Sequence, residues 1–215
     1  RGLIDHVPEL AIADILGSTE GGMGQSIMTK DTPASETAKF TLLPVAKVLV
    51  PDGSREVVPG SGEVGMVAQG GMVPLGYYKD PEKSAKTFKE VDGKRYAFIG
   101  DMATVEADGT INLLGRGSNC INTGGEKVFP EEVEEALKLH ADVADALVFG
   151  LEDERFGNRV AGVVSLEQGG TAEAGDILEA TRKLLASYKL PKDLLVVPVV
   201  PRAPNGKADY KTAKS

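Results

Sequence analysis

An α+β fold is predicted for this chain: a mostly antiparallel, barrel-like β region comes first, and a small α+β domain follows it. Three observations predict this class. Asp-Gly pairs separate β-favouring stretches in the first half, a Pro-Glu-Glu helix start lies in the second half, and two amphipathic helical stretches alternate there with strands. We expect the first domain to cover residues 1–116 and the second to cover residues 117–215.

The first half is expected to be built from hairpins. Asp-Gly pairs supply the positive φ angles that tight hairpin turns need, and three of them occur before residue 117. The pairs are Asp52-Gly53, Asp92-Gly93 and Asp108-Gly109. Strands are predicted at residues 45–50, 63–68, 95–99 and 110–114. This pattern indicates an antiparallel meander or half-open barrel.

After Gly117 the sequence pattern changes from successive strands to helices that alternate with strands. A proline and two acids at residues 130–132 are the chemistry that the first turn of a helix favours. A second amphipathic helix is predicted from an apolar stripe that runs from Ile177 to Tyr188. Strands are predicted at residues 143–149, 160–166 and 194–200. About a hundred residues with this pattern are enough for a compact domain.

Composition and charge narrow the function classes. The formal net charge of −8, from 24 Lys and Arg against 32 Asp and Glu, disfavours a general grip on nucleic acid or on an anionic membrane. Cys120 is the only cysteine, and His6 and His140 lie far apart, so we expect neither an intrachain disulfide nor a Cys/His metal cluster. No apolar run of about 18 residues and no leader are present, which predicts a cytoplasmic protein. The chain begins at Arg1 without an initiator Met, which indicates a fragment.

The common catalytic signatures are absent from the sequence, including the phosphate-binding loop, the dinucleotide-binding glycine motif, the serine elbow and the zinc-binding His-Glu motif. Polar clusters remain at residues 17–22, 100–101, 115–117, 124–127 and 204–207. Each cluster alone has a structural explanation: a turn cap, a turn residue, a surface ion pair, a hairpin tip or a solvated loop lysine.

Together, in order and spacing, these clusters resemble the second half of the AMP-forming acyl-CoA synthetases of the adenylate-forming superfamily. The similar segments are GSTEGG (17–22), GEVGMVAQGGMVPLGYY (62–78), DPEKSAKTF (80–88), YAFIGD (96–101), GRGSNCINTGGEKVFPEEVE (115–134), YKLPK (188–192) and PNGKADY (204–210). The resemblance implies that residues 1–116 are the C-terminal part of a truncated AMP-binding domain, and that residues 117–215 are a small mobile domain. Most of the large N-terminal domain, with its phosphate loop, is then missing.

The resemblance implies an ATP site at the first cluster. Gly17 and Ser18 line the adenine pocket, where a glycine permits close backbone approach. Thr19 donates its hydroxyl to the α-phosphate. Glu20 helps to hold Mg²⁺, which prefers carboxylate and phosphate oxygens.

Three further residues are implied to act on the nucleotide. Asp101 accepts hydrogen bonds from the ribose hydroxyls, a task that suits an ionised carboxylate. Arg116 lies along ribose and phosphate as a fixed cation. Lys207 bridges the substrate carboxylate and the nucleotide during adenylation, so that Lys207, Thr19 and Glu20 are the implied catalytic residues.

The small domain is implied to rotate between an adenylation pose and a thioester-forming pose. In the second pose Lys207 withdraws, and the loop at Gly124, Gly125, Glu126 and Lys127 lines the tunnel for the pantetheine arm of coenzyme A. The implied hinge lies at Gly117-Ser118. Three positions depart from the family pattern: Leu16 replaces an aromatic residue, Ile99 replaces Thr or Ser, and Ser118 replaces a charged residue.

The implied activity is that of an acyl-CoA ligase in fatty-acid or lipid metabolism. It activates a fatty or similarly apolar carboxylic acid with ATP and transfers the acyl group to coenzyme A. This fragment alone is expected to be inactive. Two alternatives remain open: an adenylation enzyme that loads a carrier-protein phosphopantetheine, and a non-catalytic nucleotide-binding or interaction module. The sequence leaves the acyl chain length and any homo-oligomer open.

Overall fold

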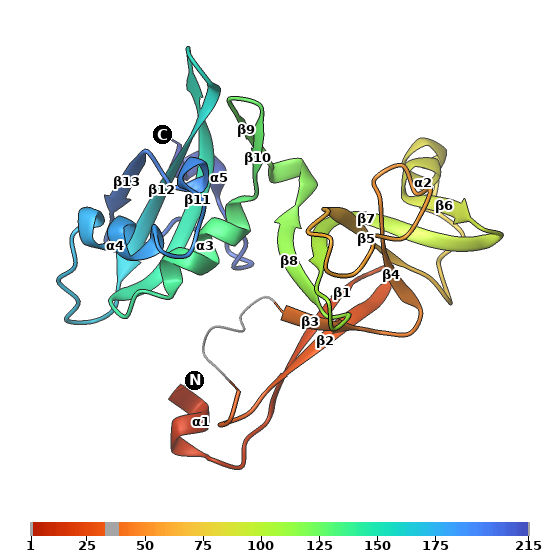
Figure 1. Cartoon of the computed structure of the whole chain (residues 1–215), viewed down its shortest axis with the longest axis horizontal. Coiled ribbons are helices and arrows are strands. Elements are labelled where there is room, and N and C mark those ends of the chain that lie inside the picture. Colours follow the sequence, from red (N-terminus) through yellow and green to blue (C-terminus); the bar gives the residue numbers. More distant parts are fainter. Residues whose placement is uncertain (1, 33–38, 215) are drawn as a thin grey trace. The chain divides into compact units, whose positions relative to one another are not determined.

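The computed structural model describes residues 2–32 and 39–214. It contains two compact units, Arg1–Leu114 and Gly115–Ser215 (Figure 1). Both units contain mostly antiparallel strands and a few short helices, so the predicted α+β class is confirmed. No helix of the described residues is long and apolar enough to cross a membrane.

The first unit is built around an eight-stranded sheet. Its strands follow the order β1-β2-β3-β8-β7-β5-β4, and β6 pairs with β7 outside this path. The helices are α1 (Gly2–His6) and α2 (Pro81–Thr87), and the strands are β1 (Ile12–Ser18), β2 (Gly21–Met28), β3 (Lys39–Leu42), β4 (Ala46–Leu49), β5 (Gly65–Gln69), β6 (Phe88–Val91), β7 (Lys94–Val105) and β8 (Ile111–Arg116). Every pairing in this sheet is antiparallel.

Two of the three Asp-Gly pairs close hairpins. Asp92 and Gly93 both have positive φ, 50° and 71°, and they join β6 to β7 as a two-residue turn. Gly109, with φ 83°, ends the turn between β7 and β8. Asp52-Gly53 also forms a turn, and the chain after it bonds back to β4 and its neighbour Val50 around a bridge between Leu49 and Glu56, without forming a named strand.

The four strands predicted in the first half are present as β4, β5, β7 and β8. The sequence analysis missed β1, β2, β3 and β6. The core of this unit contains fully buried side chains that alternate along these strands, among them Met23, Val67, Ala103 and Ile111.

The second unit contains a five-stranded sheet in the order β10-β9-β12-β11, with β13 pairing parallel to β12. The strands are β9 (Ile121–Thr123), β10 (Glu126–Val128), β11 (Val143–Asp153), β12 (Gly157–Leu166) and β13 (Asp193–Val196). The helices are α3 (Pro130–Lys138), α4 (Ala174–Thr181) and α5 (Tyr210–Ala213), with short 3₁₀ turns at Gly117–Asn119 and Ser187–Lys189. The predicted helix start at Pro130 is confirmed, as are the strands at 143–149 and 160–166.

Both faces of this sheet are covered. Val148 and its same-face neighbours pack with Leu137 of α3 and Ile177 of α4. Leu147 points to the opposite face, because successive strand residues alternate, and it packs there with Val200 and the C-terminal segment. The chain after β13 therefore lies against β11 and β12, across the sheet from α3 and α4.

Two predicted extents in the second unit are wrong. The stripe from Ile177 to Tyr188 is not one helix: α4 ends at Thr181, after which Lys183 and Leu184 donate to carbonyls three residues back and the helix tightens into a turn. The strand predicted at residues 194–200 ends at Val196. Its ladder stops before Pro198, which has no N–H to donate.

Candidate functional site

The Thr19–Glu20 pair forms the turn between β1 and β2. The pairing register of these strands shifts between Leu16 and Gly17, next to the turn. A Cβ on Gly17 would lie 3.3 Å from the carbonyl oxygen of Gly21, so a larger residue would crowd the facing strand. The glycines of the GSTEGG segment thus let the two backbones approach closely around one threonine and one glutamate.

The Glu20 carboxylate accepts hydrogen bonds from two hydroxyl groups. The Tyr77 hydroxyl donates to Oε1 at 2.5 Å, and the Thr19 hydroxyl donates to Oε2 at 3.1 Å. The Glu20 amide in turn donates to the Ser18 hydroxyl at 3.2 Å. The Tyr77 hydrogen bond is the main reason why the pKa of Glu20 is lowered to about 2. Glu20 is therefore an ionised acceptor at neutral pH.

Tyr77 contacts the candidate site through Glu20 and was not predicted from the sequence. It lies 57 positions from Glu20 in the chain, so no local spacing links the two residues. The loop around it is well fixed: the Ser84 hydroxyl accepts from the Tyr77 amide at 2.8 Å, and the Lys83 ammonium lies 4.1 Å from the centre of the Tyr77 ring. Its ring also packs against Phe88, with 5.3 Å between centroids. Tyr77 is thus held in place to orient Glu20.

The Gln69 side chain packs against Gly21, directly after the same turn. It is buried, and a Cβ on Gly21 would lie 2.1 Å from its Nε2 atom. Gly21 has φ 146°, a conformation that side-chain-bearing residues rarely adopt. Gly21 therefore lets the Thr19–Glu20 turn lie directly against a buried amide.

Asp101 lies at an irregular point of β7. Opposite β5, Met66 pairs with Met102 while Ala68 pairs with Phe98, so β7 carries extra residues at this point. Gly100, immediately before Asp101, has φ 96°. Such bulges redirect a side chain relative to the regular pleat. Asp101 is only 9% exposed, so it is one of the few buried carboxylates of the described residues.

Arg116, the last residue of β8, is exposed and lies beside the Glu131 carboxylate of α3. The Arg116 amide donates to Glu131 Oε1 at 3.5 Å, and the Asn119 amide group donates to the same oxygen at 3.1 Å. A Cβ on Gly115 would lie 2.2 Å from Glu131 Oε2. Glycine at position 115 thus allows the carboxylate to pack against the backbone just before the predicted hinge.

The Gly124–Gly125 pair forms the tip of the β9–β10 hairpin. Both residues have positive φ, 60° and 91°. A Cβ on Gly125 would meet nothing within 4 Å, so backbone conformation and not crowding requires a glycine there. Glu126 and Lys127 follow on the exposed strand β10.

Lys207 is exposed on a short hairpin formed by residues 202–208. The ends of this hairpin are joined by a bridge between Arg202 and Ala208, and the Ala203 amide donates to the Lys207 carbonyl at 2.8 Å. Asn205 Oδ1 accepts from the Lys207 amide at 3.2 Å, and Gly206 has φ 79°. The Asn-Gly pair therefore makes the turn that presents the lysine to solvent.

The predicted residues are divided between the two units. The first unit contains Gly17, Ser18, Thr19, Glu20 and Asp101, and the second contains Arg116, Gly124, Gly125, Glu126, Lys127 and Lys207. Within the first unit, the β1–β2 turn brings together Ser18, Thr19 and Glu20.

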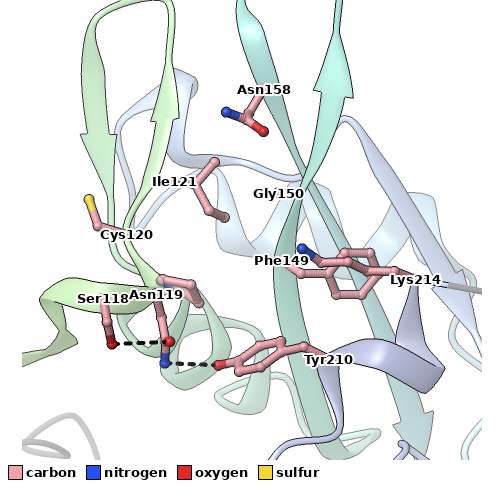
Figure 2. Close-up of a pocket in the computed structure, with 10 residues that line it drawn as sticks. Ser118, Asn119, Cys120, Ile121, Phe149, Gly150, Asn158, Tyr210 and Lys214 are labelled. Atoms are coloured by element: carbon pink, nitrogen blue, oxygen red, sulfur yellow. Dashed lines mark hydrogen bonds between the residues drawn. The ribbon is translucent and has the colours of Figure 1, made fainter.

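A cavity of about 270 Å³ in the second unit contains none of the predicted site residues (Figure 2). The Asn119 amide donates to the Tyr210 hydroxyl at 3.5 Å on one side, and Phe149 and Lys214 lie on another (Figure 2). Burial raises the pKa of Tyr210 to about 12, so this phenol stays protonated.

The side chains that could bind a metal ion indicate which metal fits the candidate site. Within residues 2–32 and 39–214, no group of three or more His, Cys, Asp or Glu side chains could enclose an ion. A single ionised carboxylate such as Glu20 fits Mg²⁺, which is commonly held by one or two carboxylates and by substrate phosphates. It does not fit a structural zinc site, which needs four protein ligands.

A family model of AMP-binding enzymes and curated acyl-CoA ligases match this chain. Residues 132–207 match the family model described as the AMP-binding enzyme C-terminal domain. The chain is 46% identical over 214 residues to the 3-oxocholest-4-en-26-oate–CoA ligase of Rhodococcus rhodochrous, covering 98% of this chain and 38% of the relative. It is 45% identical over 212 residues to the medium/long-chain-fatty-acid–CoA/3-oxocholest-4-en-26-oate–CoA ligase of Mycobacterium tuberculosis, covering 99% of this chain and 39% of the relative.

Solved structures are similar over the same extent. Apo MatB from Rhodopseudomonas palustris has a TM-score of 0.74 at 28% identity, over 93% of this chain and 39% of that one. The amide bond synthetase McbA from Marinactinospora thermotolerans has a TM-score of 0.78 at 26% identity, over 93% of this chain and 41% of that one. The chain thus spans about two fifths of the length of the proteins it matches.

Proposed function

Since this chain belongs to the adenylate-forming enzyme superfamily, where it corresponds to the C-terminal part, we propose that the protein containing it is an AMP-forming acyl-CoA ligase. One observation carries this proposal: identity of 45–47% to acyl-CoA ligases extends along 98–99% of the chain, through both units and every polar cluster described above.

In the first half-reaction, we propose that an oxygen of the substrate carboxylate attacks the α-phosphorus of ATP. The bond to pyrophosphate breaks, and an acyl-adenylate forms. Negative charge builds on the phosphate oxygens, so fixed donors are needed there. Thr19 would donate its hydroxyl to the α-phosphate, and the Lys207 ammonium would neutralise charge between carboxylate and phosphate. The exposed Lys207 hairpin supports this role, because it leaves the ammonium accessible.

Glu20 is the residue of this chain that would bind Mg²⁺, which neutralises phosphate charge and orients the leaving pyrophosphate. The low pKa of Glu20 supports this role, since the carboxylate is ionised before any cation arrives. Its orientation by Tyr77 fits the same purpose.

The remaining residues of the nucleotide site would hold adenosine. Gly17 and Ser18 would lie along adenine, where the close approach of β1 and β2 would crowd a larger residue at position 17. Asp101 would accept from the ribose hydroxyls, and Arg116 would lie along ribose and phosphate.

In the second half-reaction, the coenzyme A sulfur would attack the carbonyl carbon of the adenylate. AMP leaves, a thioester forms, and the thiol proton passes to solvent. Lys207 has no role in this step. We propose that the second unit turns about Gly117–Ser118 and brings the loop at Gly124–Gly125 and Glu126–Lys127 to the pantetheine tunnel. The division into two compact units and the exposed hairpin at Gly124–Gly125 support this two-pose scheme.

We propose a medium- to long-chain fatty acid, or a similarly bulky apolar carboxylic acid, as the substrate. Relatives named for medium- and long-chain fatty acids and for a steroid carboxylate support this class. The alternative acceptor is a carrier-protein phosphopantetheine. Thioester formation assayed with coenzyme A and with a holo carrier protein separates the two, and product on the carrier alone would rule out coenzyme A.

The proposal is tested in the complete enzyme with Lys207→Ala. We expect ATP–pyrophosphate exchange to fall by at least about 100-fold, the effect of losing one electrostatic donor at a developing anion. Thioester formation from supplied acyl-adenylate should change by less than about twofold, because the scheme gives Lys207 no part in it. Lys211→Ala is the matched control, since Lys211 is another exposed lysine four residues further on. Unchanged pyrophosphate exchange in Lys207→Ala would assign the donor role to another cation, and absence of exchange in the wild-type enzyme would favour a non-catalytic nucleotide-binding module.

A further inference from the structure

The hairpin that carries Lys207 is attached to the sheet of its unit through Arg202. The Arg202 guanidinium donates from Nε to Asp145 Oδ2 at 2.9 Å and from Nη2 to Asp145 Oδ1 at 2.6 Å. Nη2 also donates to the Ala146 carbonyl at 3.2 Å. This two-pronged geometry fixes direction as well as distance, which a single ion pair does not.

The attachment point on β11 is itself held by neighbouring elements. Asp145 and Ala146 lie near the start of this long strand, just after an irregularity in its pairing between Val143 and Asp145, and from Asp145 onward the strand pairs regularly with β12. The outer edge of β11 is also fixed from α3, because Glu134 Oε1 accepts from the Val148 amide at 2.8 Å. Arg202 therefore connects the hairpin to a strand that is held by β12 along one edge and by α3 along the other.

The pair is stronger than an ordinary surface contact. The two side chains are only 32% and 33% exposed, so solvent screens them less than fully exposed charges. The Arg202 guanidinium helps to keep the pKa of Asp145 below its usual value against the opposing effect of burial, and Asp145 raises the pKa of Arg202. Both groups stay charged throughout the neutral range.

We propose that Arg202 is a positioning residue for adenylation: its fork on Asp145 fixes the 202–208 hairpin so that the Lys207 ammonium is delivered to one place. This inference rests on the role proposed above for Lys207. A lysine stem is flexible, so the backbone from which it starts decides where the ammonium can reach. A displacement of about 1 Å in a reacting group can cost about 100-fold in rate.

The chain offers a close control for the loss of an arginine contact. Arg159 donates from Nε to Asp193 Oδ2 at 2.6 Å and from Nη1 to the Glu152 carbonyl at 2.8 Å. Like Arg202, it joins a carboxylate and a backbone carbonyl on the same sheet, but it is not part of the Lys207 hairpin. Its removal reports the general effect of breaking such a contact.

The test measures both half-reactions in the complete enzyme. For Arg202→Gln and Asp145→Asn we expect ATP–pyrophosphate exchange to fall about 10- to 100-fold in kcat, with thioester formation from supplied adenylate changed by less than about twofold. Arg202→Lys, which keeps the charge but loses the fork, should recover part of the exchange activity. Arg159→Gln should leave both half-reactions within about twofold of the wild type.

A double variant separates positioning from general structural damage. If Arg202 acts through Lys207, Arg202→Gln combined with Lys207→Ala should be no slower in exchange than Lys207→Ala alone. Multiplied losses in the double variant, equal losses in both half-reactions, or the same loss in Arg159→Gln would overturn the inference.

Failure of this inference and failure of the proposed function give different results. If Lys207→Ala abolishes exchange while Arg202→Gln and Asp145→Asn leave it unchanged, only the positioning role is wrong. If Lys207→Ala itself leaves exchange unchanged, the role proposed for Lys207 is wrong as well, and a wild-type enzyme that shows no exchange at all would overturn the proposed function. Should Arg202→Gln fold poorly, Asp145→Asn and Arg202→Lys, which preserve side-chain volume, decide between these results.

Discussion

A buried carboxylate in the second unit gives the sharpest prediction about stability. Glu134 of α3 is 8% exposed, and its Oε1 accepts from the Val148 amide at 2.8 Å. Burial is the largest cause that raises the pKa of this carboxyl from 4.5 to about 7, and nearby Glu131 acts in the same direction. The Val148 hydrogen bond and the cations of Arg202 and Lys138 oppose the rise without cancelling it.

The sign of the pH effect follows from the raised pKa. Below pH 4.5 Glu134 is protonated in both the folded and the unfolded chain, so this carboxyl does not lower the free energy of unfolding. Between pH 4.5 and about 7 the unfolded chain loses the proton while the folded chain keeps it, and stability falls as pH rises. Above pH 7 the full cost is present, about 3 kcal/mol, because each tenfold change in a proton dissociation constant is worth about 1.4 kcal/mol.

The variant that tests this is Glu134→Gln. Its amide resembles the protonated carboxyl and can still accept from Val148, but it cannot ionise. We expect it to be more stable than the wild type by up to about 3 kcal/mol at pH 8.5, with the difference vanishing by about pH 4. Urea unfolding followed by circular dichroism at steps between these pH values measures the difference.

Glu135→Gln is the matched control on the same helix. Glu135 is 37% exposed and pairs with Lys138, so its replacement should change stability little and without this pH profile. A Glu134→Gln variant that is less stable than the wild type at pH 8.5, or a difference that does not vary with pH, would refute the assignment of a buried, protonatable carboxyl.

Three further predictions concern other positions. Tyr77→Phe removes the donor to Glu20, so the pKa of that carboxyl should rise from about 2 toward 4.5 in a carbon-detected NMR titration; an unchanged pKa would mean that Tyr77 does not orient it. Gly125→Leu strains a φ of 91° and should slow thioester formation at least about tenfold, while ATP–pyrophosphate exchange stays within about twofold of the wild type. The control is Gly169→Leu, which strains a φ of 87° in another turn and should not slow thioester formation in this way. Equal effects of the two variants would contradict the tunnel role. Gly65→Ala places a Cβ 2.6 Å from two valine side chains and should destabilise the first unit by about 2 kcal/mol in urea unfolding, so a neutral result would show that the core relaxes more easily than its packing indicates.

Local signals in the sequence predicted the elements that depend on local chemistry. Asp92-Gly93 turns the chain because both residues adopt positive φ, and Pro130 begins α3 because its missing N–H costs nothing in a first turn. Apolar periodicity alone was less reliable. It extended the second helix to Tyr188, although Thr181 binds the Ile177 carbonyl and the helix ends there.

Site residues were predictable where they lie in one short segment. Thr19, Glu20 and Lys207 were predicted from short segments that resemble those of the family, and their roles stay predictions. Their supporting partners were not predicted. Tyr77 contacts Glu20 from 57 positions away in the chain, and Asp145 holds Arg202 of the Lys207 hairpin from 57 positions away. Such contacts depend on tertiary packing, which a single sequence reveals only when the fold is known.

The central claim is that Lys207 and the Thr19–Glu20 turn act on the phosphate of the same ATP. A crystal structure of the complete enzyme with a non-hydrolysable acyl-adenylate analogue measures this directly. The account predicts the Lys207 Nζ and Thr19 Oγ1 atoms both within about 3 Å of oxygens around the analogue's phosphate position. A closed complex in which the Thr19 hydroxyl meets the analogue and a different cation occupies the place assigned to Lys207 would contradict it.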